Sequence, residues 1–499
     1  MPLFGRTTWC LLVLAWTCGA SANWESLPAE VERGMELWHV PGMAVAVVDS
    51  DNVRFQSGFG TTALEDGKPV DQHTLFAIAS TTKAMVVAGI LILADEGKLS
   101  LDDPVTRHIP ELHFDNATLD LELNIRDLLA HRTGLPSTNG WSFMQGMPLD
   151  EQIRRLSLVE QQAPARSRLI YQNTMYELAG EIIERVSGQP WDEFLTERLW
   201  HPIGMMETYG ARGQIKRRES HVLPYNYLGG ALRQVDWNFD ADFADAAGSA
   251  WSSVHDMSLW AQFLLRGAVT ANGERLISED GLAEMFEPHQ LASPGDFYPT
   301  VALTKPNWRT YGLGWFQQDF QGRMINFHTG SLAGLIAIIG LDIANDKAVI
   351  VLGNRDHAEM RHALLWYVMD ETAPAEKRDW NQEIWDLYEE SRLEAVARQE
   401  ERKKSRLPDT KPALPLEAYA GTYTNDVAGD VTLRLVDGGL RLQTAMLELE
   451  MKHWHLNTFQ IVFRDYDFLS FGTFNISPIG AVVSVSLSGQ EYRRSADSQ

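Results

Sequence analysis

Ser80 and Lys83 form a Ser-x-x-Lys pattern, in which a hydroxyl nucleophile and an amine base could act together. A separation of three places both side chains on one face of a helix. Residues 80–96 are apolar on almost every side and end at Gly97, as in a buried helix. Burial lowers the pKa of an amine towards that of a general base, and the N–H groups at a helix start favour a developing oxyanion. The pattern therefore predicts a serine activated by a lysine, although a capping serine before an exposed lysine has the same spacing.

Two further short patterns follow in the chain. Tyr171 and Asn173 lie just before an amphipathic helical segment. A tyrosine beside a lysine can transfer protons, and an asparagine amide can hold a substrate carbonyl. The run His328-Thr329-Gly330 comes at the end of a predicted strand, whose free edge could pair with an extended acyl chain. Together the three patterns predict one site for acyl transfer.

In this order the patterns resemble the signature of the serine β-lactamase and penicillin-binding protein superfamily, which is Ser-x-x-Lys, then Tyr-x-Asn, then Lys-Thr-Gly or His-x-Gly. The chain is most similar to the branch that contains class C β-lactamases, esterases and D-aminopeptidases. The resemblance covers roughly residues 28–370, and the tail around Tyr419–Tyr423 is similar to the lipocalin-like C-terminal domain of some of these hydrolases. The other stretches that carry it are 40–44, 75–80, 127–135 and 311–315.

The resemblance implies a role for each matched residue. Ser80 would be acylated, Lys83 would take or relay its proton, and Tyr171 would join Lys83 in proton transfer to the leaving group and in deacylation. The backbone N–H groups of Ser80 and Ser331 would form the oxyanion hole, worth about 3–4 kcal/mol per donor in comparable enzymes. The residues expected to bind substrate are Asn173, His328, Thr329, Gly330 and Ser331.

His328 departs from the pattern of many β-lactamases, which have lysine there. A neutral imidazole holds a substrate carboxylate less firmly than a permanent ammonium does. We therefore expect an ester, an amide or a D-amino-acid peptide as substrate rather than efficient β-lactam hydrolysis. The same departure also permits an alternative, a binding protein with a worn active site that acts through its C-terminal barrel.

The expected fold class is α+β. Strand signals at 43–48 and 53–58, and again at 324–327, 334–342 and 347–352, flank a mainly helical middle. They predict a β-lactamase/transpeptidase-like antiparallel sheet flanked by helices, with a helical subdomain. Residues 416–495 alternate like short antiparallel strands and predict a small C-terminal antiparallel β-barrel.

We expect four segments along the chain: a signal peptide at 1–22, the hydrolase domain at 23–372, a linker helix at 373–412 and the lipocalin-like barrel at 413–499. Arg6, the apolar run 9–16 and the small residues Ala20-Ser21-Ala22 are typical of a secretory signal. They predict a periplasmic or secreted protein. Both cysteines lie within this signal, so the mature chain would have no disulfide and no cysteine nucleophile.

The composition limits the partners. A net charge of −24 argues against binding to nucleic acid, and after the signal the sequence has no apolar run long enough for a membrane span. It has no Gly-x-Ser-x-Gly, His-Glu-x-x-His or phosphate-loop motif, so we expect no cofactor and no metal. The expected partner is a small-molecule or peptide substrate, and a homo-oligomer is possible.

Three other motifs have competing interpretations. Ser137-Thr138-Asn139 matches the Ser-x-Asn motif of class A β-lactamases, but it also follows Pro136 as a loop would. His453-x-His455 could bind zinc from one face of a strand, but no third ligand pattern accompanies it. Tyr423-x-Asn425 repeats the Tyr-x-Asn spacing, and we expect a turn there.

Overall fold

The structure is a computed structural model of the 499-residue chain. It describes residues 24–141, 145–210, 215, 220–235, 245–373, 376–464 and 469–495. The predicted signal peptide, residues 1–22, lies outside the described residues.

The main sheet has eight strands in the order β2-β1-β12-β11-β10-β9-β8-β7. Strands from both ends of the domain meet where β1 pairs with β12, antiparallel from Met43 opposite Gly353 to Val48 opposite Ala348. Every residue of β1 and β11 is buried, because helices cover both faces of the sheet at these strands. The bounds are β1 Gly42–Val48, β2 Val53–Gly60, β7 Gln290–Leu291, β8 Arg309–Tyr311, β9 Phe316–Phe320, β10 Arg323–Leu332, β11 Leu335–Asp342 and β12 Lys347–Gly353.

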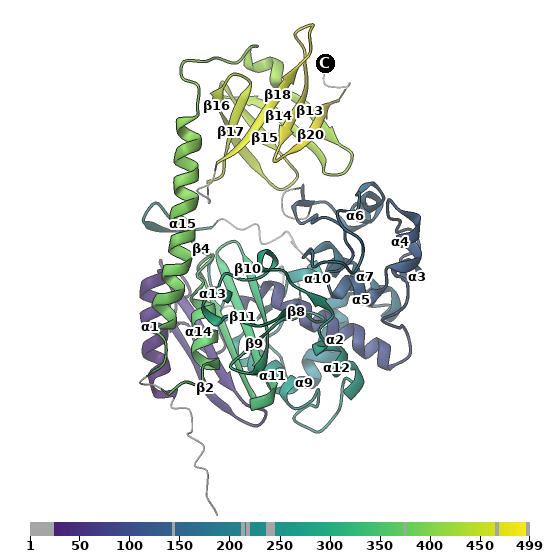
Figure 1. The fold of residues 1–499 in the computed structure, drawn as a ribbon, viewed down its shortest axis with the longest axis vertical. Helices are drawn as coiled ribbons and strands as arrows, with labels where there is room; N and C mark the ends of the chain where they lie inside the picture. Colours follow the sequence, from purple (N-terminus) through teal and green to yellow (C-terminus); the bar gives the residue numbers. More distant parts are fainter. Residues whose placement is uncertain are drawn as a thin grey trace, which may run out of the picture.

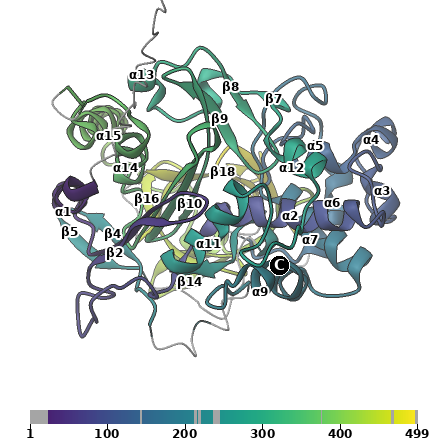
Figure 2. The same cartoon turned by 90° about the horizontal axis from the view of Figure 1, so that it is seen from below.

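Two hydrophobic cores lie on opposite faces of this sheet (Figure 2). On one face pack α1 Leu27–Trp38, α14 Met360–Met369 and the start of α15 Trp380–Lys404. On the other face lie α11 Val254–Leu265 and the larger helical region. The predicted α+β fold, a transpeptidase-like antiparallel sheet flanked by helices with a helical subdomain, is confirmed.

The helical region surrounds α2, Thr82–Asp95, whose residues from Thr82 to Leu93 are all buried. Its other helices are α3 Val105–His108, α4 Ala117–Glu122, α5 Ile125–Leu129, α6 Leu149–Arg155, α7 Thr174–Ser187, α8 Trp191–Leu195, α9 His201–Ile203, α10 Asp245–Gly248 and α12 Glu279–Phe286. The short helix α13 Val301–Thr304 and the two-stranded pairs β3 Phe76–Ala77 with β6 Trp251–Ser252 and β4 Tyr225–Leu228 with β5 Ala231–Gln234 complete the domain.

Ser80 lies just outside α2, in the 3-10 turn η2 Ala79–Thr81, whereas the sequence pattern places it in the helix itself. Two hydroxyls tighten this turn: Thr81 donates to the Ile78 carbonyl at 2.8 Å and Thr82 to the Ala79 carbonyl at 2.6 Å. Ala79 adopts a left-handed φ of 47°, which is costly for a residue other than glycine. The turn therefore fixes the position of Ser80 at a cost in backbone strain.

Strand β10 crosses directly over this turn. A Cβ atom on Gly330 would lie 2.1 Å from the Ile78 carbonyl oxygen, so only glycine permits the approach. The same close approach joins the central sheet to the residues that precede Ser80.

The C-terminal barrel is a closed ring of eight antiparallel strands, as predicted. In Figure 1, α15 extends from the sheet towards this barrel. The strands are β13 Gly421–Asn425, β14 Gly429–Val436, β15 Gly439–Gln443, β16 Glu448–His455, β17 Thr458–Val462, β18 Ser470–Ile476, β19 Val482–Leu487 and β20 Gln490–Arg494.

The turn expected at Tyr423-x-Asn425 is wrong, because these residues form the end of β13. Tyr423 is buried in the barrel core, donates its hydroxyl to the Tyr419 carbonyl at 2.8 Å and stands opposite Arg494 where β13 and β20 close the ring. Among the described residues, no helix is both long and apolar enough to cross a membrane.

Candidate active site

The three sequence patterns meet at one cavity of about 350 Å³. Ser80 comes from η2, the Tyr171–Asn173 segment from the loop before α7, and the His328–Ser331 segment from β10. The residues that line the cavity are Ser80, Tyr171, Asn173, Asp296, Phe297, Tyr298, Phe316, His328, Thr329 and Ser331. Lys83 is buried beside Ser80, and Gly330 faces the turn that carries the serine.

Lys83 makes three hydrogen-bonding contacts. Its Nζ lies 3.2 Å from Ser80 Oγ, 2.8 Å from Asn173 Oδ1 and 2.6 Å from the Ala247 carbonyl oxygen. The amine also lies 5.0 Å from the centre of the Tyr171 ring. These contacts bring together all four groups that the patterns assign to proton transfer and positioning.

The protonation of the site follows from burial. Desolvation lowers the pKa of Lys83 to about 7, although the charge of Glu177 opposes this shift. Burial raises the pKa of Tyr171 far above its usual range, and a hydrogen bond with Ser80 only partly opposes the effect. Near neutral pH, Lys83 can therefore accept a proton, while Tyr171 remains a neutral phenol that can only donate or relay one.

His328 is buried and carries no positive charge. Desolvation, with a contribution from Lys83, lowers its pKa to about 3. Its Nδ1 lies 2.7 Å from the Thr329 carbonyl oxygen and must donate to it, which leaves Nε2 to accept from the Tyr311 hydroxyl at 3.1 Å. Both ring nitrogens are thus occupied within the protein, and the ring offers a substrate neither a charge nor a free donor.

Strand β10 offers a free edge at the cavity. Its pairing with β9 ends at Phe327, whereas its pairing with β11 continues to Leu332. From His328 to Leu332, no strand of the described part of the chain pairs with the side that β9 would occupy. The predicted edge for an extended acyl chain is therefore present, within a strand that is longer than the sequence indicates.

Arg361 supports this edge from behind, and the motif analysis does not identify it. Its Nη1 donates to the Gly330 carbonyl at 2.5 Å and to Ser331 Oγ at 2.8 Å. Its Nε and Nη2 donate to the two carboxylate oxygens of Glu359, each at 3.0 Å. Burial alone would raise the pKa of Glu359, but the charge of Arg361, together with a hydrogen bond from His357 and the charges of His357 and His362, holds that pKa well below its usual range. The pair lies at the start of α14, about 30 residues after β10 in the sequence. Only the folded structure, in which Arg361 contacts β10, shows that the pair belongs to the site.

His131 is a second residue of the site without a role from the motifs. It is fully buried, its ring centre lies 4.2 Å from that of Tyr171, and its Nδ1 accepts from the Gln172 backbone N–H at 3.4 Å. Burial and the charge of Lys83 hold its pKa well below the usual range. A neutral imidazole in this position adds no competing positive charge beside Lys83.

The side chains of the competing motifs do not line the cavity that holds Ser80. Ser137 lines a different cavity from the one that holds Ser80, while Asn139 Oδ1 accepts from the Asn173 backbone N–H at 2.7 Å. His453 Nε2 bonds to the Leu456 carbonyl, and His455 Nδ1 accepts from the Leu407 N–H. The pairing of β16 with β17 shifts register between His453 and His455, so the regular spacing expected of two ligands on one strand face is interrupted.

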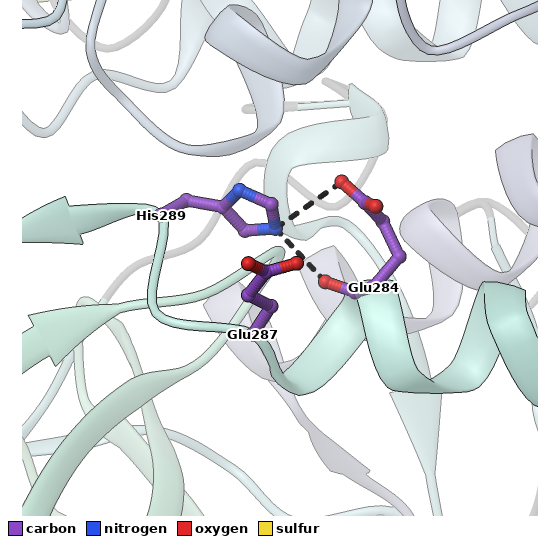
Figure 3. A group of neighbouring side chains, drawn as sticks. All are labelled: Glu284, Glu287 and His289. Atoms are coloured by element: carbon purple, nitrogen blue, oxygen red, sulfur yellow. Dashed lines mark hydrogen bonds and ion pairs between the residues drawn. The ribbon is translucent and has the colours of Figure 1, made fainter.

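Within the described residues, one group of three potential metal-binding side chains is close enough to share an ion: Glu284, Glu287 and His289 (Figure 3). His289 Nε2 lies 2.9 Å from the Glu284 carbonyl oxygen, and Arg126 binds the Glu284 carboxylate. The group does not line the cavity at Ser80. His289 and Glu284 are held by protein contacts, and we assign the group no role in the reaction.

Comparison with known proteins places the chain in a family. The sequence model of the Beta-lactamase family matches residues 28–373, and that of a domain of unknown function (DUF3471) matches residues 405–497. The chain therefore belongs to the Beta-lactamase family, and it is a β-lactamase-fold hydrolase with an additional C-terminal barrel.

Individual relatives agree with this assignment. An unguisins hydrolase of Aspergillus campestris is 29% identical over 81% of this chain and 76% of its own length. The octameric penicillin-binding protein homologue from Pyrococcus abyssi has a TM-score of 0.61, with 21% identity over 94% of this chain and 99% of that one. The D-amino acid amidase from Ochrobactrum anthropi has a TM-score of 0.51 and 25% identity over 66% of this chain and 88% of its own.

The buried Arg361–Glu359 pair generates a stability prediction. We expect Arg361→Met to lower the free energy of unfolding by about 3–5 kcal/mol, because the buried carboxylate of Glu359 loses its guanidinium partner. The double variant Glu359→Gln/Arg361→Met should recover part of that loss. Urea denaturation measures the free energy of unfolding of both variants.

As a control, Arg168→Met removes an exposed partner of Asp296 and should change the free energy of unfolding by at most about 1 kcal/mol. Equal losses in the single and double Arg361 variants would contradict a coupled pair.

Proposed function

We propose that this chain is a serine hydrolase that forms a covalent acyl-enzyme on Ser80. The observation that supports it is the contact of Ser80 Oγ, at 3.2 Å, with a buried lysine amine whose pKa is about 7. A serine hydroxyl is a weak nucleophile unless a base accepts its proton. Lys83 supplies that base without a histidine or a metal.

The hydrogen bonds of Lys83 suit the neutral amine. A neutral amine has two N–H donors and one lone pair. The Asn173 Oδ1 and Ala247 carbonyl oxygens are both acceptors, so they use the two donors. The lone pair then faces the third contact, Ser80 Oγ, and can accept the proton of the hydroxyl. The surrounding acceptors thus orient the base as well as desolvating it.

The reaction then proceeds in two balanced steps. Ser80 Oγ attacks the carbonyl carbon of the substrate while its proton passes to Lys83, and the negative charge gathers on the carbonyl oxygen, near the N–H groups of Ser80 and Ser331. Lys83 returns the proton through Tyr171 to the leaving alcohol or amine as its bond to carbon breaks. Water then attacks the acyl carbon and gives a proton to Lys83 and Tyr171. The bond between the acyl carbon and Ser80 Oγ breaks, Oγ takes that proton back, and the acid leaves.

The charges of the cavity favour a substrate that is uncharged near the scissile bond. Among the described residues that line it, Asp296 is the one with a carboxyl group, and none is a lysine or an arginine. Arg168 lies 3.7 Å from Asp296. His328 is neutral, with both nitrogens bonded. We therefore propose an ester, an amide or a D-amino-acid peptide, a view that the similarity to a D-amino acid amidase supports.

Location and assembly are separate proposals. The signal-like N-terminus leads us to propose export to the periplasm or secretion. The similarity to an octameric homologue leads us to propose a homo-oligomer.

The first prediction here concerns the covalent adduct. A fluorophosphonate probe should add to the wild-type chain, and intact-mass spectrometry should detect the adduct, because the probe captures a serine whose proton is withdrawn. The variant Ser80→Ala should show no adduct. Ser137→Ala is the matched control, since it removes the serine of the competing motif and should retain full labelling. An unlabelled wild type would favour the alternative, a binding protein with a worn active site.

The second prediction concerns substrate charge. The kcat/KM for an uncharged p-nitrophenyl ester should exceed that for nitrocefin, which carries a carboxylate, by at least about tenfold, since none of the described residues that line the cavity is a lysine or an arginine that could pair with that group. Steady-state hydrolysis followed by absorbance measures both values. A preference for nitrocefin would rule out this assignment of substrate class.

A further inference from the structure

A second cavity, of about 250 Å³, lies between the barrel and the hydrolase domain, where the loop at 136–141 and Gln145 face the barrel. The barrel contributes residues from β14 to β20 and the segment before β14, and the hydrolase domain contributes the loop and Val159. The residues that line it are Pro136, Ser137, Thr138, Gly140, Trp141, Gln145, Val159, Val427, Ala428, Val431, Leu442, Thr444, Leu449, Ile461, Phe463, Ser470, Leu487, Ser488, Gln490 and Tyr492.

Contacts between the two domains form this chamber. Arg155 Nη1 donates to the carbonyl oxygens of Asn425 and Asp426, at 3.1 and 2.6 Å. The side chains of Tyr492 and Gln145 are hydrogen-bonded to each other across the boundary. Neither domain alone would supply all of the walls.

The lining chemistry defines what could bind there. No aspartate, glutamate, lysine, arginine or histidine is among the described residues that line the chamber. Aliphatic and aromatic side chains supply most of its walls, and the polar groups are neutral hydroxyls and amides. A charged ligand would lose its hydration without a counter-charge, which is costly. A neutral apolar ligand gains by leaving water, and a few neutral polar groups suffice to orient it.

The volume limits the size of the ligand. An apolar cavity of about 150 Å³ holds a benzene ring in a well-studied protein. In proportion, about 250 Å³ accommodates roughly ten carbon atoms. A medium-length alkyl chain with one neutral polar end fits both the size and the lining.

The chamber is distinct from the active site but shares a wall with it. No residue lines both cavities. However, Asn139, in the loop that forms the wall, accepts from the Asn173 N–H at 2.7 Å, and the Thr138 and Thr174 hydroxyls are 2.8 Å apart. Asn173 in turn bonds to Lys83. Ordering of the loop by a ligand would therefore act on the group that orients the base.

We propose that this chamber binds an uncharged, chiefly apolar molecule of roughly ten carbon atoms, and that its occupancy modulates the hydrolase site through the loop at 136–141. The second half of this inference rests on the proposed function, whereas the first half does not. Binding requires only the chamber.

Isothermal titration calorimetry of the full chain with 1-decanol and with decanoate tests the binding. The two probes have the same chain length, and only one is charged at neutral pH. We expect decanol to bind at least about tenfold more tightly than decanoate, because the walls offer no counter-charge. Equal affinities, or no heat with decanol, would overturn the proposal. Repeating the titration with Ser80→Ala separates this outcome from any failure of the hydrolase assignment.

Two variants locate the bound decanol. Val431→Phe fills the chamber from β14, and Ser488→Asp adds a charge to its lining from an exposed turn that should tolerate the change. Each should weaken decanol binding at least about tenfold. Val483→Asp adds the same charge to a position that is 44% exposed and outside the chamber, and it should leave binding unchanged. Unchanged binding in Ser488→Asp and Val431→Phe alike would place the decanol elsewhere and overturn the assignment.

The effect of decanol on the rate of ester hydrolysis tests the coupling between the chamber and the hydrolase site. Saturating decanol should change the kcat for a short p-nitrophenyl ester by at least about twofold in the wild type. The variant Asn139→Ala should reduce that change, because it removes the bond between the loop and Asn173. A rate that decanol leaves unchanged in the wild type would refute the coupling, even where calorimetry supports the binding site.

Discussion

The site depends on keeping one amine neutral in a dry place. Lys83 is fully buried, and its surroundings lower its pKa to about 7, so that it can remove a proton from Ser80 near neutral pH. Burying an ionisable amine is costly, and two fixed acceptors, Asn173 Oδ1 and the Ala247 carbonyl, offset part of that cost by pairing with its N–H groups. The residues of α2 that follow Lys83 are apolar from Ala84 to Leu93. The same helix gives the domain much of its core, so stability and reactivity depend on the same residues.

Precise placement of Ser80 requires contact between distant parts of the chain. The turn η2 is strained at Ala79, and β10 lies against it at Gly330, where a side chain would collide with the backbone. Arg361 then holds the carbonyl of Gly330 and the hydroxyl of Ser331 from the opposite side of the strand. Contacts thus run without a break from the turn that carries the nucleophile, through the edge of β10 that faces the substrate, to the buried Arg361–Glu359 pair.

Local sequence signals predict much of this architecture. The β1–β2 hairpin, the buried α2 and the end of α7 before Gly188, whose φ is 79°, follow from turn residues and apolar patterning. The full length of β10 does not, because His328 to Ser331 is a polar run that becomes a strand only through its pairing with β11. Likewise, the tight turn at Ser80 and the Arg361–Glu359 pair depend on contacts between segments far apart in the chain, which periodicity cannot reveal. The residues of the three motifs meet at the cavity, as their order suggests. The contact of the barrel with the loop at 136–141, in contrast, has no signature in the sequence.

The pH dependence of acylation examines the role of Lys83 most directly. With an uncharged ester, the single-turnover acylation rate should rise with pH as Lys83 loses its proton and should level off above a midpoint near pH 7, since only the neutral amine can accept the Ser80 proton. Rates for Ser80→Ala, measured in parallel, remove the contribution of hydroxide. A rate that does not change between pH 5 and 9, or a midpoint near that of an exposed lysine at about 10.4, would contradict the account.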